Sequence, residues 1–230
     1  MLKEKLSQFL YRKYSCSFSQ GGEDVMLAGL FSKSKGFFVD IGAFHPVKFS
    51  NTFLLYRKGW NGINIDAAPG SMDEFKKLRP RDINIESAIS DKDEELTYYY
   101  LGKGNSMNTF SKDFIDEHNF AGKVQKTINI KTQRLENILD KLAPATDIDF
   151  MSIDVEGLEI NVLDSNNWDK YRPKAILLES FELMNDQNDY DLDLKGFLYK
   201  KDYKVIGKTL NSILFLRKDI ALDNFLRIIP

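Results

Sequence analysis

The stretch from Gly36 to Thr52, GFFVDIGAFHPVKFSNT, predicts a strand, a loop and the start of a helix. Phe37 to Val39 form an apolar run typical of a buried strand, which stops at the acidic Asp40 and is followed by Gly42. The last three residues, Ser50 to Thr52, favour a helix N-terminus. A carboxylate at the carboxyl end of a strand, then a glycine and a helix, is how an open α/β sheet forms a ligand crevice. We therefore expect the ligand at this loop.

The loop lacks the three glycines that bring a backbone close to a pyrophosphate, because Gly42 is followed by AFHP. This disfavours phosphate cradling and, with it, a nicotinamide-dependent oxidoreductase. An acid at a strand end beside one close-approach glycine suits a ligand with hydroxyls or positive charge. S-adenosylmethionine offers a ribose, an ammonium and a sulfonium.

Composition narrows the function classes. The chain has 230 residues, 43% of them hydrophobic, which suits one domain with one sizeable core. Its net charge of -2 gives no basic field for nucleic acid or anionic membrane, so an RNA methyltransferase is disfavoured. The single Cys16 excludes an internal disulfide, and no window approaches the roughly 20 apolar residues of a membrane span. We expect a cytoplasmic protein with a small, neutral or polar substrate.

Two segments near the N-terminus have helical periodicity, Met1 to Tyr14 and Glu23 to Phe31. We expect residues 1–35 to pack as a helical segment on a domain formed by residues 36–230, in a single domain overall. The polar stretch from Ser19 to Asp24 lies between the two helices. On local evidence it caps the second one, where acids offset the helix dipole.

Further strands are also predicted to end on acids. Ile63 to Ile65 precede Asp66, Phe150 to Ile153 precede Asp154, and the apolar run after Lys174 ends on Glu179. Such a row of like charges at one sheet edge would repel itself unless a cationic ligand, a metal or hydroxyl donors compensate. For Asp66, contact with ribose hydroxyls and plain solvation at the strand end are equally open. The prediction that matters most is that Asp40, Asp66 and Asp154 share one rim.

Glu156 lies two residues beyond Asp154, across a predicted strand-to-helix turn, so both can face one crevice. A desolvated carboxylate there suits a base or a ligand of a divalent cation, with Asp154 and Glu179 as its candidate ligands. The alternative is that Glu156 and Glu159 only complement the dipole of the following helix.

Other segments are predicted to have structural roles. Ile83 to Ile89 form a third strand that exits at Ser90, and the basic run from Lys76 to Arg81 is the solvated C-terminal face of a helix. The loop from Gly102 to Asn108 is a connector or a substrate-side lid. Two closing strands, Tyr203 to Gly207 and Ser212 to Leu216, predict a hairpin and hence a mixed sheet with one antiparallel strand.

Four stretches together resemble the ordered motifs of the FkbM-type methyltransferase family: SQGGEDVML, GFFVDIGAFHPVKFSNTFLLYRKGWNGINIDAAPGS, SIDVEGLEINVL and AILLES. The resemblance extends from about Ser19 to Leu216. It implies a class I, Rossmann-like methyltransferase dependent on S-adenosylmethionine: an α/β three-layer sandwich with a mostly parallel, seven-stranded sheet whose last strand is antiparallel. It also implies O-methylation, of a hydroxyl on a sugar, glycan precursor or natural product, with a bacterial sugar preferred.

The resemblance assigns roles to residues that match its motifs. Around the cofactor it places Gln20, Asp40, Gly42, Ala43, Asn51, Asp66, Ala67, Ser87, Ala88, Ile89 and Asp154. Facing the methyl group and the acceptor it places Asp154, Glu156, Glu179 and His45, and it makes Glu23 and Asp24 walls of the pocket. The chain departs from the pattern at Asp66, where similar sequences often have Glu, and this shorter acid shifts the ribose contacts slightly.

The acceptor hydroxyl needs a base or a cation that lowers its pKa, and the base is Asp154, Glu156 or His45. A rival interpretation is a non-catalytic relative that binds a nucleoside or a partner protein. Among partners we expect a small-molecule or glycan acceptor, no nucleic acid and no membrane span. A homodimer is left open.

Overall fold

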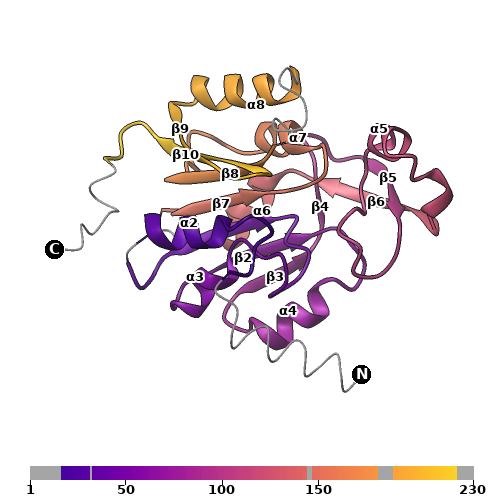
Figure 1. Ribbon diagram of the computed structural model, residues 1–230, viewed down its shortest axis with the longest axis horizontal. Coiled ribbons are helices and arrows are strands. Elements are labelled where there is room, and N and C mark those ends of the chain that lie inside the picture. Colours follow the sequence, from indigo (N-terminus) through magenta and orange to yellow (C-terminus); the bar gives the residue numbers. More distant parts are fainter. Residues whose placement is uncertain (1–16, 32, 144–146, 181–188, 222–230) are drawn as a thin grey trace.

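The computed structural model describes residues 17–31, 33–143, 147–180 and 189–221. Figure 1 shows a central sheet with helices on both sides and a smaller sheet beside it. The central sheet has seven strands, in the order β3 (Ile83–Glu86), β2 (Asn61–Asp66), β1 (Phe37–Ile41), β7 (Phe150–Ile153), β8 (Ala175–Glu179), β10 (Ser212–Arg217) and β9 (Tyr203–Lys208). Neighbouring strands from β3 to β8 are parallel, whereas β10 pairs antiparallel with both β8 and β9. The predicted mostly parallel sheet with an antiparallel C-terminal strand is confirmed.

The strand order reverses between β1 and β7. From β1 the chain proceeds outward to β2 and β3, and it later returns to place β7 on the other side of β1. Open α/β sheets bind ligands at the carboxyl ends of the strands that flank such a switch point. The topology therefore directs attention to the loops that follow Ile41 and Ile153.

Alternation along the strands divides the core into two layers. On β1, Val39 packs in a cluster with Leu139 and Leu163, whereas Phe38 packs in a separate cluster with Leu27 and Leu55. The first cluster is covered by α6 (Leu135–Leu142), α7 (Glu159–Asp164) and α8 (Asp189–Lys200), and the second by α2 (Glu23–Leu30) and α3 (Phe53–Arg57). The result is the predicted three-layer α/β sandwich.

A separate three-stranded sheet was not predicted. It consists of β4 (Ala88–Ile89), β6 (Lys126–Gln133) and β5 (Glu95–Tyr100), and α5 (Lys112–Glu117) and a 3-10 helix (Ala121–Lys123) lie in the β5–β6 connection. The single third strand predicted over Ile83 to Ile89 is wrong, because β3 pairs with β2 whereas β4 pairs with β6. The break falls at Ser87, whose N–H donates to the Asp66 carbonyl. Local residue preferences carry no information about which distant strand β3 or β4 pairs with.

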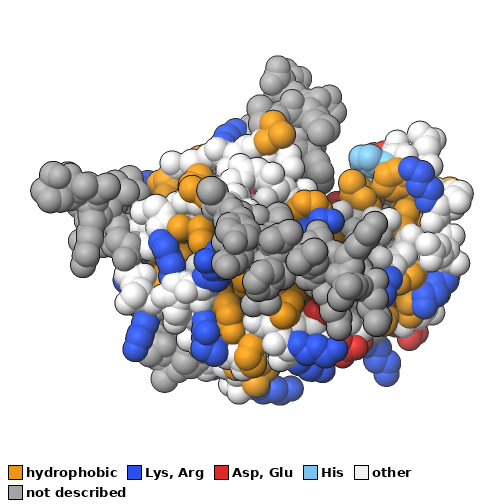
Figure 2. All heavy atoms as spheres, turned by 60° about the horizontal axis from the view of Figure 1, so that its bottom comes forward, with side chains coloured by type: hydrophobic (Ala, Val, Ile, Leu, Met, Phe, Trp, Pro, Cys, Tyr) orange, Lys and Arg blue, Asp and Glu red, His pale blue; other side chains and the backbone are white. Residues whose placement is uncertain are grey.

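The predicted helix at Glu23 to Phe31 is present as α2. The helix predicted at Met1 to Tyr14 lies outside the described residues, and so does Cys16. Within the described part of the chain, no helix is long and apolar enough to cross a bilayer. On the face in Figure 2, Lys and Arg side chains are spread among hydrophobic and uncharged ones instead of forming one continuous patch. The division into residues 1–35 and 36–230 stays a prediction.

Candidate functional site

A pocket of about 550 Å³ lies at the carboxyl ends of the parallel strands. Asp40 on β1, Asp66 at the end of β2 and Asp154 just after β7 all line it. The three acids therefore lie on one rim, as the strand pattern predicted. A volume of this size is within the range of small-molecule sites.

Most of the predicted site residues line this pocket: Gln20, Asp40, Gly42, Ala43, His45, Asn51, Asp66, Ala67, Asp154 and Glu156. Six others are not among its lining residues: Glu23, Asp24, Ser87, Ala88, Ile89 and Glu179. The structure adds wall residues that the sequence did not indicate, chiefly Phe44, Phe49, Tyr98, Tyr100, Thr109 and Phe110. The loop predicted as a connector or lid also reaches the pocket, from Lys103 to Ser106 and at Asn108.

Gly42 allows two backbone segments to meet. Its φ is 77°, and a Cβ atom at this position would lie 1.6 Å from the carbonyl oxygen of Asp154. The N–H groups of Gly42 and Ala43 both donate to the Ile65 carbonyl, and Asp154 N–H donates to the Ile41 carbonyl. The glycine was predicted to allow close approach of a ligand. Instead, its missing side chain admits the backbone after β7, and this contact fixes Asp154 beside the end of β1.

Asp66 organises the loop above β2. Its Oδ2 accepts from the N–H of Phe44 at 2.9 Å, and its Oδ1 accepts from that of Ala68 at 2.8 Å. Burial raises the pKa of Asp66, although these hydrogen bonds oppose the rise. A carboxylate has about four acceptor positions. The two backbone N–H groups use two of them, and the remaining positions face Ser71 and hydroxyl donors from the pocket.

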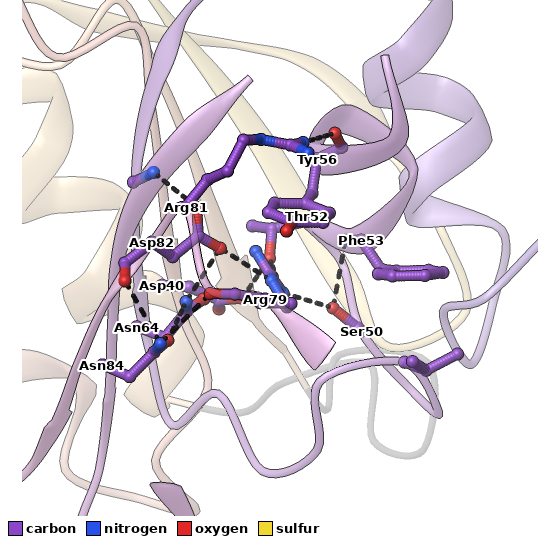
Figure 3. Close-up of polar contacts among 12 residues, drawn as sticks. Asp40, Ser50, Thr52, Phe53, Tyr56, Asn64, Arg79, Arg81, Asp82 and Asn84 are labelled. Carbon is purple, nitrogen blue, oxygen red and sulfur yellow. Dashed lines mark hydrogen bonds and ion pairs between the residues drawn. The ribbon is translucent and has the colours of Figure 1, made fainter. Parts of the chain in front are cut away.

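Asp40 is 4% exposed and reaches a buried polar network. Figure 3 shows that network around Arg79, with Asp40, Thr52 and Asp82 close by. Thr52 Oγ1 donates to Asp40 Oδ2 at 2.5 Å and accepts from Arg79 Nη1 at 3.0 Å, while Arg79 Nε donates to Asp82 Oδ2 at 2.7 Å. Burial raises the pKa of Asp40 to about 6, against the opposing effects of Thr52 and Arg79.

Arg79 corrects a prediction. It belongs to the basic run that was expected to be solvated, yet it is completely buried, and its guanidinium lies 5.1 Å from the ring centroid of Phe38 and 5.5 Å from that of Phe75. The reason is helical spacing. Met72 and Phe75 are the buried positions of α4 (Met72–Leu78), and Arg79 follows four residues after Phe75 on the same face.

Three carboxylates meet beside the pocket. Asp154, Glu156 and Glu179 each offer an oxygen, and these oxygens lie within 4.8 Å of one another. Burial raises the pKa of all three, and the charges of neighbouring acids add to the effect for each of them. The cluster therefore favours retained protons at pH values where isolated carboxyls are ionised, and its oxygens could hold a cation instead.

The turn after β7 aims Glu156 toward this cluster. Glu156 adopts a left-handed conformation with a φ of 54°, and Gly157 follows with a φ of 102°. Glu159 Oε1 holds the turn by accepting from the N–H groups of Val155 at 3.0 Å and Gly157 at 3.4 Å. Glu159 thus has a structural task besides any effect on the helix dipole.

A comparison with models of protein families shows which family the chain belongs to. The family model described as the methyltransferase FkbM domain matches residues 40–205. The chain belongs to the FkbM methyltransferase family. The family predicted from the sequence motifs is confirmed, and no curated protein matches this sequence.

Solved structures similar to this FkbM-family chain are distant in sequence. Precorrin-6y C5,15-methyltransferase from Geobacter metallireducens is 14% identical, with 84% of each chain covered and a TM-score of 0.46. Fibrillarin from Aeropyrum pernix, in complex with natively bound S-adenosyl-L-methionine, is 8% identical, with 85% of this chain and 73% of that one covered and a TM-score of 0.49. The O-methyltransferase from Bacillus cereus, in complex with SAH, is 13% identical, with coverages of 93% and 88% and a TM-score of 0.43.

His45 lines the pocket of the FkbM-family chain, but both of its ring nitrogens are engaged. Nδ1 accepts from the N–H groups of Val47 at 3.1 Å and Lys48 at 2.9 Å, and Nε2 lies 3.2 Å from Glu74 Oε2. Desolvation lowers the pKa of His45, although Glu74 opposes this. The role of base stays a prediction, and the observed contacts give His45 the task of holding its loop.

The N-terminal motif of the FkbM-family chain contributes Gln20 to the pocket and uses its acids for structure. Asp24 accepts from the Phe18 N–H at 2.7 Å and from the Ser19 hydroxyl at 2.8 Å. Buried Glu23 accepts from the N–H of Gly21 at 2.8 Å. The two acids fold the loop that presents Gln20, which explains why the motif contains them although neither lines the pocket.

Ser87, Ala88 and Ile89 were assigned to the adenine ring by resemblance. In the structure the Ser87 hydroxyl accepts from Gln133 Nε2 at 2.8 Å, and the buried Ala88 and Ile89 form β4 in the small sheet. They start beside Asp66, because Ser87 N–H donates to its carbonyl. Their contact with adenine stays a prediction.

Proposed function

We propose that this FkbM-family protein transfers a methyl group from S-adenosylmethionine to a hydroxyl of a small-molecule or glycan acceptor. The observation that carries the proposal is the convergence of Asp40, Asp66 and Asp154 on one pocket at the switch point of the sheet. Such a concentration of buried and half-buried acids favours a ligand that carries positive charge and hydroxyl donors. S-adenosylmethionine has both.

The residues present fit this donor. Asp66 has remaining acceptor capacity for the ribose hydroxyls, at the end of the second strand. Asp40 and Asp154 lie near the point where the loops after β1 and β7 touch, and Gln20 and Asn51 line the same region. Asn51 is fixed by donating to Ser152 Oγ at 3.1 Å. We assign this part of the pocket to the methionine portion of the donor.

The donor supplies an activated methyl group, so the protein has two tasks: to align the acceptor oxygen and to receive its proton. The oxygen bonds to the methyl carbon as the carbon–sulfur bond breaks, and the hydroxyl proton leaves. Asp154 and Glu156 are the carboxylates of the cluster that reach the pocket. We assign the role of proton acceptor to one of them. Glu179, which belongs to the cluster but does not line the pocket, shares the proton.

A divalent cation at the same cluster is the second way to activate the hydroxyl. The mutual spacing of the oxygens of Asp154, Glu156 and Glu179 suits an oxygen-ligated cation. Metal dependence separates the two mechanisms. Turnover that EDTA abolishes and Mg²⁺ or Mn²⁺ restores supports the cation, whereas turnover that EDTA leaves unchanged supports a shared proton.

The test is methyl transfer from S-adenosylmethionine to a panel of sugar nucleotides, glycosides and other hydroxyl compounds, followed by mass spectrometry. We expect a methylated product and S-adenosylhomocysteine in equal amounts. Glu156→Gln should reduce turnover by about 10²-fold or more while the donor still binds, whereas Asp154→Asn should reduce both turnover and donor affinity. Asp164→Asn, an exposed acid on α7, is the matched control. Donor binding without transfer to any member of a broad panel would support the non-catalytic alternative.

A further inference from the structure

Three polar residues precede α3, and their side chains have three different partners. Ser50 Oγ accepts from the Phe53 N–H at 3.1 Å and so satisfies a backbone donor at the start of the helix. Asn51 Nδ2 donates to Ser152 Oγ. Thr52 is the N-cap residue by position, yet its side chain makes no capping hydrogen bond. Its hydroxyl therefore has a task other than starting the helix.

The Thr52 hydroxyl joins Asp40 to Arg79. Its Oγ1 donates to Asp40 Oδ2 at 2.5 Å and accepts from Arg79 Nη1 at 3.0 Å (Figure 3). The direction of both hydrogen bonds is fixed, because a guanidinium has no acceptor atom and an ionised carboxylate has no donor. All three side chains are buried, and those of Thr52 and Arg79 are completely so. The arrangement therefore favours the ionised form of Asp40.

The second oxygen of Asp40 is available to a ligand. Asp40 lines the pocket, whereas Thr52 and Arg79 do not. Thr52 holds Oδ2, and among the described residues none donates a hydrogen bond to Oδ1. The hydroxyl thus fixes one carboxylate oxygen and leaves the other for a donor group in the pocket.

We propose that Thr52 is a positioning residue for donor binding: it holds the Asp40 carboxylate so that the free oxygen pairs with the ammonium of S-adenosylmethionine. The proposal rests on the proposed function, which gives this part of the pocket to the methionine portion of the donor. Thr52 does not line the pocket, so it acts only through Asp40.

Charged groups surround Asp40 on several elements. Those that face it are Arg79 after α4, Asp82 before β3, Asp66 at the end of β2 and Asp154 after β7. Only the arginine favours the ionised form of Asp40, and the three acids oppose it. Burial raises the pKa of Asp40 to about 6, and the hydrogen bond from Thr52 is the largest effect that opposes the rise. Removal of the hydroxyl should therefore raise this pKa further.

The test is calorimetric titration of the full chain with S-adenosylhomocysteine at about pH 6.5 and about pH 8.5. Thr52→Val has nearly the same shape but no hydroxyl. At the lower pH it should bind about tenfold more weakly than the wild type, because protonated Asp40 does not pair with the ammonium. At the higher pH Asp40 is ionised in both proteins, so their affinities should agree within about threefold. The ratio of the two affinities at one pH cancels the titration of the ligand itself.

Two further variants distinguish positioning from packing. Thr52→Ser keeps the hydroxyl and should restore the wild-type affinity at both pH values. Thr132→Val is the matched control, because Thr132 is also buried and donates to the Lys92 carbonyl at 2.7 Å, but it does not line the pocket. It should lower Tm and leave the affinity for S-adenosylhomocysteine unchanged at both pH values. Thr52→Ala, with the same expectations as Thr52→Val, serves if the valine variant does not fold.

Three outcomes would overturn the proposal while the proposed function stands, provided that the wild type binds S-adenosylhomocysteine. The first is wild-type affinity in Thr52→Val at both pH values. The second is an equal loss of affinity at both, which a merely structural role would give. The third is failure of Thr52→Ser to restore binding. A wild type that does not bind S-adenosylhomocysteine at either pH would contradict the proposed function itself.

Discussion

Gly42 lies so close to Asp154 that any side chain on the glycine would collide with the aspartate's carbonyl oxygen, at 1.6 Å from an added Cβ atom. The contact joins the loops that follow the two strands flanking the switch point of the sheet. It places Asp154 and the turn that carries Glu156 at a fixed position relative to the rim acids. The site can therefore form only because residue 42 has no Cβ atom.

Gly42→Ala should be strongly destabilising. The added Cβ must displace the Asp154 backbone and also adopt a φ of 77°, and together these cost about 3 kcal/mol or more of the free energy of unfolding. Gly22→Ala is the matched control, because Gly22 has a φ of 87° but no atom within 4 Å of an added Cβ. Urea unfolding of both variants measures the difference. Equal losses in the two variants would show that the close contact is unimportant.

Asp40 predicts how stability depends on pH. Its folded-state pKa is about 6 against an ordinary value of 3.8, because burial disfavours the charged form. The contribution of Asp40 to the free energy of unfolding is fully present below pH 3.8. It falls by up to about 3 kcal/mol as the pH rises through about 6, because the folded state retains a proton that the unfolded state has lost. Asp40→Asn should therefore flatten the fall in unfolding free energy between pH 4 and 7, and Asp164→Asn controls for the loss of one charge. An unchanged slope in Asp40→Asn would contradict the assignment.

Arg79 should be indispensable to the fold although it does not line the pocket. Arg79→Met leaves Asp82 buried without its cation and removes the donor to Thr52, which should cost about 3–5 kcal/mol in urea unfolding. Arg79→Lys should not restore stability, because one ammonium cannot reproduce the guanidinium fork. Lys76→Met, at an exposed position of α4, should change stability by less than about 0.5 kcal/mol. Wild-type stability in Arg79→Met would refute a structural role for the network.

The strand-end acids were predictable because a short apolar run that stops at Asp or Glu indicates both a buried strand and its carboxyl end. For the same reason Asp40, Asp66, Asp154 and Glu179 could be placed at one edge before any coordinates. The helical spacing of Arg79 from Met72 and Phe75 was only weak evidence that its side chain is buried. The dominant local feature was the basic run around it, and a buried arginine is rare.

Other features depend on long-range geometry that the sequence does not display. The split between β3 and β4 is decided by pairing with β2 and β6, which lie elsewhere in the chain. The contact partner of Gly42 is more than a hundred residues away in sequence, and Phe44, which has a left-handed conformation, donates its N–H to Asp66 on another strand. Residues at functional sites are the ones most expected to depart from local sequence preferences.

The central claim is that the rim of acids binds an adenosyl methyl donor, and calorimetric titration with S-adenosylhomocysteine tests it most directly. We predict saturable binding near the micromolar range. Asp66→Ala should weaken it about tenfold or more through loss of the charged hydrogen bonds to the ribose, while Asp164→Ala should leave it unchanged. Absence of binding up to millimolar ligand, or equal affinity in wild type and Asp66→Ala, would contradict the account.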